Sequence, residues 1–333
     1  MKIGKAMLLL ASFGIPIYLI SVLGIVNWHF VFKFIEEYSL EVISVIVLML
    51  AINSLGWVRW HILVRANDLK ISRITSYTLA QYSGLFSFFL PGQFGADTAK
   101  ILALNIGVVD RLEKFGERNI APITGTAIDR LLALSSQIIW ALIFMYFYFR
   151  PYAMDFFASF HAGILIIAFS GMVLATVVVV FLLVYLFKAL NNLFMHRGLV
   201  AYFINLVKII LDFIRERVVL VLVLMTLSLA LNALAILSMY LIARESITDL
   251  DMFSLALATI LSNLASVVPI TPGGLGISES IFSEISSALS SNPELINMGS
   301  IYMVYRFCSL GAFCLGTLLG VIVDRLFYRT SIR

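Results

Sequence analysis

The chain has 333 residues, of which 61% are hydrophobic and only 13% are charged, and its net charge is +4 at pH 7. Its mean hydropathy is +1.02. Soluble domains contain about 45–50% apolar and about 25% charged residues, so this composition excludes a single water-soluble core. Lipid must be the solvent for much of the surface. The sequence predicts an all-α polytopic membrane protein with one transmembrane domain over residues 1–333.

Six stretches contain the roughly twenty apolar residues that are needed to cross a bilayer. The first, 6–26, follows two lysines and has too long an apolar core for a cleavable signal peptide. We therefore interpret it as the first transmembrane helix. The other five are 41–64, 119–149, 161–187, 218–242 and 299–323.

Two further apolar stretches, 74–90 and 252–268, run into segments rich in proline and glycine. Neither segment is followed by a second full span. Irregular backbone within a membrane is tolerated only where protein or a wet cavity surrounds it. We therefore expect two re-entrant pairs of half-helices. The break residues are Pro91, Gly92, Gly95, Pro272, Gly273, Gly274 and Gly276.

The placement of the 23 Lys and Arg residues predicts the orientation. With a cytoplasmic N-terminus, eighteen of them lie on the cytoplasmic side, and only Lys33, Arg150 and Arg244 lie outside. This positive-inside bias predicts a cytoplasmic (inner) membrane protein with both termini in the cytoplasm. Arg59 and Lys100 are counted as cytoplasmic. Lys100 is either a cavity residue or a cytoplasmic lysine that extends to the interface, and we favour the second interpretation.

Residues 199–217 carry Lys208, Asp212 and Arg215 at spacings of four and three, which places them on one face of a helix. An amphipathic helix lying at the inner membrane surface fits this pattern better than a seventh span.

The two halves of the chain share short segments in the same order. AINSL (51–55) matches ALNAL (230–234), SGLFS (83–87) matches SNLAS (262–266), and PGQFGAD (91–97) matches PGGLGISE (272–279). We expect a first repeat over residues 1–150 and a second over 161–327. Three spans per repeat is an odd number, so the second repeat enters the membrane inverted. Inverted repeats with paired helix breaks are typical of alternating-access transporters, which bind substrate at the repeat interface.

Two arginines, Arg130 and Arg306, lie within predicted spans, where each costs roughly 2.5–3.5 kcal/mol. Asp97 and Glu279 each follow a helix break, where half-helix N-termini can bind an anion. Two interpretations remain open. The arginines pair with the carboxylates to hold the breaks, or they bind a phosphate in transit while the carboxylates handle a cationic group. The candidate substrate-binding residues are Asp97, Arg130, Glu279, Arg306, Asn53 and Asn232.

The cysteines and histidines show no metal-ligand spacing, and no nucleophile–base arrangement is legible. We expect no metal, no cofactor, no nucleic-acid partner and no enzymatic activity.

The segments PGQFGADTAKILAL, AIDRLLAL, PITPGGLGISES and a final YRF resemble the transmembrane region of lysylphosphatidylglycerol synthases and of flippase-like integral membrane proteins. The resemblance extends from about residue 10 to 325. It implies that the chain moves an anionic or aminoacylated phospholipid between leaflets, with Asp97, Arg130 and Glu279 as important residues. The soluble aminoacyl-transferase domain of the full synthases is missing, so the resemblance does not imply lipid lysylation by this chain alone.

A lipid flippase or scramblase is therefore the first functional hypothesis, with membrane lipids as partners. An ion-coupled carrier for a small soluble anion is the second. The third is a non-transporting membrane subunit of an envelope lipid or glycan synthesis enzyme. Some proteins of the resembled family occur alongside glycosyltransferases, which keeps polyprenyl-linked sugars as a further cargo and a lipid-modifying enzyme or glycosyltransferase as a partner.

Overall fold

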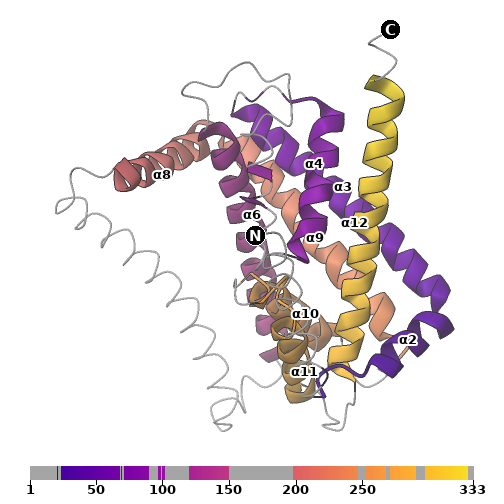
Figure 1. Cartoon of the computed structure of the whole chain (residues 1–333). Coiled ribbons are helices and arrows are strands. Elements are labelled where there is room, and N and C mark those ends of the chain that lie inside the picture. Colours follow the sequence, from indigo (N-terminus) through magenta and orange to yellow (C-terminus); the bar gives the residue numbers. More distant parts are fainter. Residues whose placement is uncertain are drawn as a thin grey trace. The chain divides into compact units, whose positions relative to one another are not determined.

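The computed structural model describes residues 21, 24–67, 69, 71–89, 97, 98, 100, 101, 120–149, 198–246, 252–267, 271–289 and 297–328. The elements in these ranges are all α-helices, which confirms the all-α class (Figure 1). The chain divides into two units, Met1–Phe144 with Leu222–Arg333, and Met145–Val221. The helices are α2 (Trp28–Glu37), α3 (Ser39–Ala66), α4 (Arg73–Ser87), α6 (Ile120–Phe149), α8 (Gly198–Glu216), α9 (Val218–Ala243), α10 (Met252–Ala265), α11 (Ile277–Leu289) and α12 (Met298–Tyr328).

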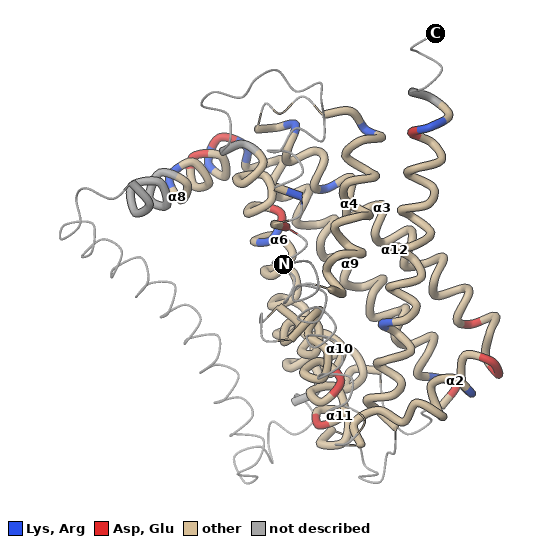
Figure 2. The backbone as a smooth tube through the Cα atoms, in the orientation of Figure 1, with Lys and Arg blue, Asp and Glu red and all other residues tan. Residues whose placement is uncertain are grey.

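Four of the described helices, α3, α6, α9 and α12, are long and apolar enough to cross a membrane. They coincide with the predicted spans 41–64, 119–149, 218–242 and 299–323, and the predicted spans 6–26 and 161–187 lie outside the described residues. Their outward faces carry exposed apolar side chains such as Val47, Leu142, Val219 and Leu318. Figure 2 shows that charged positions are sparse along these helices. The protein is a multi-pass membrane protein.

Besides α2, which has 10 residues, three described helices of the first unit are too short to cross. The 15 residues of α4, the 14 of α10 and the 13 of α11 reach about 20–23 Å at 1.5 Å per residue. The hydrocarbon core is about 30 Å thick. In Figure 1, α4 lies in the upper part of this unit, and α10 and α11 lie together in its lower part. Thus α4 lies at the opposite end of the unit from α10 and α11, and the re-entrant arrangement at 74–90 and 252–268 stays a prediction.

The turn between α10 and α11 has the backbone geometry that its glycines allow. Gly273, Gly274 and Gly276 have φ angles of 57°, 74° and 86°, a left-handed region that side chains disfavour. Glu279 then accepts a hydrogen bond from the N–H of Gly276 at 2.7 Å, which satisfies a backbone donor at the start of α11 as a capping box does. Of the first break, Pro91, Gly92 and Gly95 lie outside the described residues.

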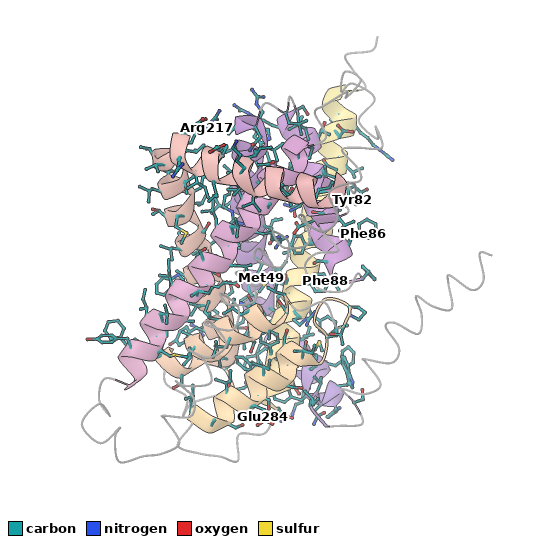
Figure 3. All side chains as sticks on the ribbon, turned by 90° about the vertical axis from the view of Figure 1, so that its left-hand side faces the viewer. Met49, Tyr82, Phe86, Phe88, Arg217 and Glu284 are labelled. Carbon is teal, nitrogen blue, oxygen red and sulfur yellow. The ribbon has the colours of Figure 1, made fainter. Side chains whose placement is uncertain are left out.

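Small residues set the packing of α4 against α12. A Cβ on Gly84 would overlap the ring of Phe313, and one on Gly316 would lie 2.6 Å from Oε1 of Gln81. Close approach of this kind is typical of small residues at helix interfaces in membranes. Because position 84 meets 313 and position 81 meets 316, the two helices run antiparallel, and the end of α4 lies beside the middle of α12. The outer face of α4 carries Tyr82 and Phe86 (Figure 3).

Side-chain hydrogen bonds tie α3 to α6 and α9. Arg59 on α3 binds Asp129 on α6 at 2.7 Å and Ser228 on α9 at 2.9 Å. Trp60 donates to Oγ1 of Thr126 at 3.1 Å. Arg59 is only 8% exposed and lies among these helices, so it is not the solvent-exposed cation that the count of charges assumed, and its assignment to the cytoplasmic side stays a prediction.

In the second unit, α8 spans Gly198–Glu216 and confirms the helix predicted at 199–217. Lys208, Asp212 and Arg215 are exposed on it, as the amphipathic pattern requires. Its position at the membrane surface stays a prediction.

Candidate functional site

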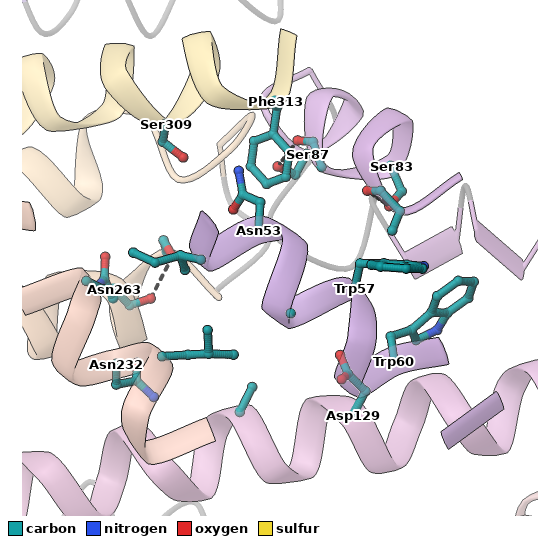
Figure 4. A pocket seen from close by; sticks show the side chains of 18 of the residues that line it. Asn53, Trp57, Trp60, Ser83, Ser87, Asp129, Asn232, Asn263, Ser309 and Phe313 are labelled. Atoms are coloured by element: carbon teal, nitrogen blue, oxygen red, sulfur yellow. Dashed lines mark hydrogen bonds between the residues drawn. The ribbon is translucent and has the colours of Figure 1, made fainter. Parts of the chain in front are cut away.

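The first unit contains a partly open cavity of about 370 Å³. Its walls come from α3, α4, α6, α9, α10 and α12 and include Lys100, so segments from both halves of the chain contribute (Figure 4). The wall combines aromatic and small residues with polar groups such as Asn53, Ser83, Asn263 and Ser309. Apolar pockets with a few convergent polar groups are the usual form of ligand sites.

An ion pair joins the first helix break to α6. Arg130 donates from Nε to Oδ2 of Asp97 at 2.5 Å and from Nη2 to Oδ1 at 2.8 Å. This two-point contact fixes the guanidinium plane against the carboxylate. The side chain of Arg130 remains 27% exposed and lines the cavity. One of the two ion pairs expected from the sequence is therefore present.

Lys100 is a second cation beside Asp97. Its Nζ lies 3.6 Å from Oδ1 of Asp97 and 5.2 Å from the centre of the Trp60 ring. The favoured interpretation of Lys100 as a lysine that extends to the interface was wrong, and the alternative of a cavity residue fits, because the residue is 7% exposed and lines the cavity. Residues three apart share a helix face, so this spacing from Asp97 was the signal in the sequence for its position.

The second ion pair joins the other break to α12. Arg306 donates from Nη1 to Oε1 of Glu279 at 3.0 Å and from Nη2 to the carbonyl oxygen of Gly273 at 2.6 Å. The side chain of Glu279 is fully buried, and that of Arg306 is 10% exposed. The guanidinium also lies 5.8 Å from the centre of the Phe88 ring. Each break therefore supplies a carboxylate to an arginine of the next long helix described.

A third buried pair, Arg59 with Asp129, was not predicted. Both residues line the cavity, and their side chains are 10% and 6% exposed. The signal in the sequence was the pair of charged residues at 129 and 130, which point to different sides of α6. Asp129 faces Arg59, whereas Arg130 faces Asp97.

Asn53 and Asn232, which hold matching positions in the predicted repeat, both line the cavity but have different hydrogen-bond partners. Asn232 donates from Nδ2 to Oγ of Ser136 at 2.7 Å and to the carbonyl oxygen of Ser228 at 3.1 Å. Nδ2 of Asn53 is buried and has no hydrogen-bond partner among the described residues. Asn53 thus has a donor available for a ligand.

The cavity is surrounded by more cations than carboxylates within the described residues. The cations that line it are Arg59, Lys100, Arg130 and Arg306. The carboxylates that pair with them are Asp97, Asp129 and Glu279. The described residues include no group of three His, Cys, Asp or Glu that could hold a metal ion. The arrangement is suited to binding an anion.

Membrane-spanning helices around a buried, cationic cavity define the class as a multi-pass membrane protein with an internal polar site. The family described as the lysylphosphatidylglycerol synthase TM region matches residues 7–316, and the chain belongs to it. This confirms the resemblance identified in the sequence. Comparison with curated proteins and with solved structures gave no match.

Proposed function

We propose that this protein is a lipid translocase that moves an anionic or aminoacylated phospholipid between the leaflets of the inner membrane. The headgroup passes through the central cavity, and no chemical change is made to it. The observation that carries the proposal is the cavity itself, which is lined by cationic side chains and formed by segments from both halves of a chain that belongs to the lysylphosphatidylglycerol synthase TM region family.

The proposal includes two re-entrant hairpins in an inverted repeat, with both termini in the cytoplasm. Three correspondences support it. Asp97 and Glu279 hold equivalent places after the two breaks, Arg130 and Arg306 bind them, and the short helices occupy opposite ends of the unit (Figure 1). Two-fold related halves of this kind can open a shared site alternately to each side of the membrane.

The ion pairs supply a way to admit and release a phosphate. A buried cation without a counter-charge is costly, so an arginine that leaves its carboxylate must gain another anion. Guanidinium groups bind phosphate in the same two-point manner as carboxylate. A headgroup phosphate can replace Asp97 on Arg130, and Asp97 takes the arginine back when the lipid leaves. The freed carboxylate is then available to the ammonium group of an aminoacylated lipid.

Gly56 allows the cavity to be blocked without disturbing the packing. It lines the cavity, and a Cβ built on it meets nothing within 4 Å. Gly56→Leu should therefore fill the translocation path and reduce exchange of a fluorescent phosphatidylglycerol in proteoliposomes by tenfold or more. Ala51→Leu is the matched control, since Ala51 is an exposed residue of the same helix outside the cavity wall. Equal exchange by Gly56→Leu, Ala51→Leu and the unmodified protein would contradict the proposal.

A carrier for a small soluble anion is the second candidate, and the size of the cavity favours it. A volume of about 370 Å³ is at the lower end of the range of about 300–1,000 Å³ for ligand pockets. It holds a headgroup or a free anion and leaves acyl chains outside. Uptake of labelled phosphate by proteoliposomes that show no lipid exchange would establish this alternative.

A further inference from the structure

We propose that the cavity binds one phosphate monoanion between Lys100 and Arg130, on the side of the first helix break, and that Arg306 takes no part in binding. This inference rests on the proposed function and deepens it by naming the subsite. The phosphate can belong to a lipid headgroup or to a free anion.

The first argument is charge balance. Four cations line the cavity and three carboxylates pair with them within the described residues. Arg59 has Asp129, and Arg306 has Glu279, each as its own partner. Asp97 alone is shared, because both Arg130 and Lys100 are ion-paired with it. The excess positive charge is therefore at Lys100 and Arg130, where one monovalent anion would neutralise it.

The second argument is the geometry of Lys100. Its Nζ is 3.6 Å from Oδ1 of Asp97, beyond the usual hydrogen-bond range of about 2.7–3.2 Å, whereas Arg130 hydrogen-bonds to both carboxylate oxygens. The ring of Trp60, whose centre lies 5.2 Å from Nζ, attracts the ammonium group but accepts no conventional hydrogen bond. An ammonium group has three donors. Phosphate oxygens in the cavity would give these donors stronger partners than the described residues provide.

The third argument is the contrast with Arg306. Its guanidinium binds the Glu279 carboxylate and the Gly273 carbonyl and lies over the Phe88 ring. To bind a ligand, Arg306 would have to leave both the break and a fully buried carboxylate. The ion pair of the second half therefore holds the structure, and that of the first half meets the ligand.

The test is isothermal titration calorimetry of the full chain in an uncharged detergent with dihexanoyl phosphatidylglycerol. Dihexanoylglycerol, which lacks the phosphate, is the ligand control, and inorganic phosphate is titrated separately. Lys100→Met should weaken phosphatidylglycerol binding by about tenfold to a hundredfold, as expected for the loss of one charge-assisted hydrogen bond. Lys100→Arg and Arg306→Lys should bind within about threefold of the unmodified protein. Lys33→Met removes the same charge from an exposed position on α2 and should bind normally.

The outcomes separate the site from the function. Equal affinity in Lys100→Met and Lys33→Met would overturn the site, and so would a loss of binding confined to Arg306→Lys. A thermal unfolding curve for each variant shows whether it is folded. If Lys100→Met is not folded, Lys100→Gln, which also removes the charge, takes its place in the binding measurement. Phosphatidylglycerol binding that depends on Lys100 identifies a lipid headgroup as the source, whereas comparable binding of inorganic phosphate alone identifies a free anion. Lys100-dependent binding without lipid exchange would support the site and contradict the translocase. Lipid exchange by a protein whose affinity for phosphatidylglycerol is unchanged in Lys100→Met would support the translocase and contradict the site.

Discussion

Nη2 of Arg306 lies 2.6 Å from the carbonyl oxygen of Gly273, so a side chain of the last long helix holds the backbone of the second helix break. The same guanidinium binds Glu279, on the first turn of α11, and lies over the ring of Phe88 at the end of α4. A Cβ on Gly273 would come within 3.2 Å of the Phe88 Cα and the Ser87 carbonyl oxygen. Arg306 therefore holds the place where the second break meets the end of the first short helix.

Replacing Arg306 should destabilise the protein strongly. Arg306→Met leaves the fully buried Glu279 without a counter-charge, and removing one partner of a buried pair costs about 3–5 kcal/mol. Adding Glu279→Gln to the same chain removes the uncompensated charge, so the double variant should recover a large part of the loss. Denaturant titration in mixed micelles measures the three free energies of unfolding. A single variant as stable as the unmodified protein would show that the pair does not hold the break.

Gly274 should not accept a side chain. Its φ angle is +74°, and a Cβ would lie 2.8 Å from the Cα of Ser266. The left-handed backbone costs an L-residue about 1–2 kcal/mol, and overpacking adds about 1–3 kcal/mol. Gly274→Ala should therefore lower the free energy of unfolding by at least about 2 kcal/mol. Gly56→Ala is the control, because that helical glycine has open space around it and alanine is the better helix former. Equal stability of the two variants would argue against a fixed left-handed turn.

The parts of the fold that local sequence determines were predictable. Apolar length marked α3, α6, α9 and α12 as spans, and the glycines at 273, 274 and 276 marked a turn that other residues disfavour. Each feature depends on the properties of one short segment. Short helices on either side of the second break followed from the same reasoning.

The buried positions of Arg59 and Lys100 depend on helix packing, which a single sequence does not display. A count of Lys and Arg assigns each cation near the end of a span to the aqueous side nearest to it. It does not reveal which of these cations point into the protein. Arg59 faces inward because Asp129 lies at the matching height of α6, 70 positions later in the chain. Asn53 and Asn232 similarly look equivalent in the repeat. Among the described residues, however, only the Nδ2 group of Asn232 has hydrogen-bond partners, which are Ser136 on α6 and the carbonyl oxygen of Ser228 on its own helix.

The two asparagines should respond differently to alanine. Asn232→Ala removes the hydrogen bond to Ser136 between α9 and α6, and such interhelical bonds contribute about 0.6 kcal/mol on average, up to about 1.7. It should lower the free energy of unfolding by about that amount. Asn53→Ala removes a buried side-chain amide whose Nδ2 has no hydrogen-bond partner in the described structure, so the free energy of unfolding should stay the same or rise. If Asn53 contacts the ligand, the same variant weakens phosphatidylglycerol binding. Parallel unfolding and binding curves measure both effects, and a larger loss of stability in Asn53→Ala would contradict this assignment.

The pair of Arg59 and Asp129 should contribute to stability and not to ligand binding. Arg59 bridges α3 to α6 and α9 through Asp129 and Ser228, and Asp129 supplies the counter-charge of Arg59. Asp129→Asn keeps the shape but removes the charge that compensates Arg59, so we expect a loss of about 3–5 kcal/mol in the free energy of unfolding. Ser228→Ala removes only one hydrogen bond of Arg59 and should cost about 1.5–3 kcal/mol at most. Fractions of each variant that remain folded should bind phosphatidylglycerol as the unmodified protein does. A folded Asp129→Asn variant of normal stability but altered affinity would instead place this pair in the binding site.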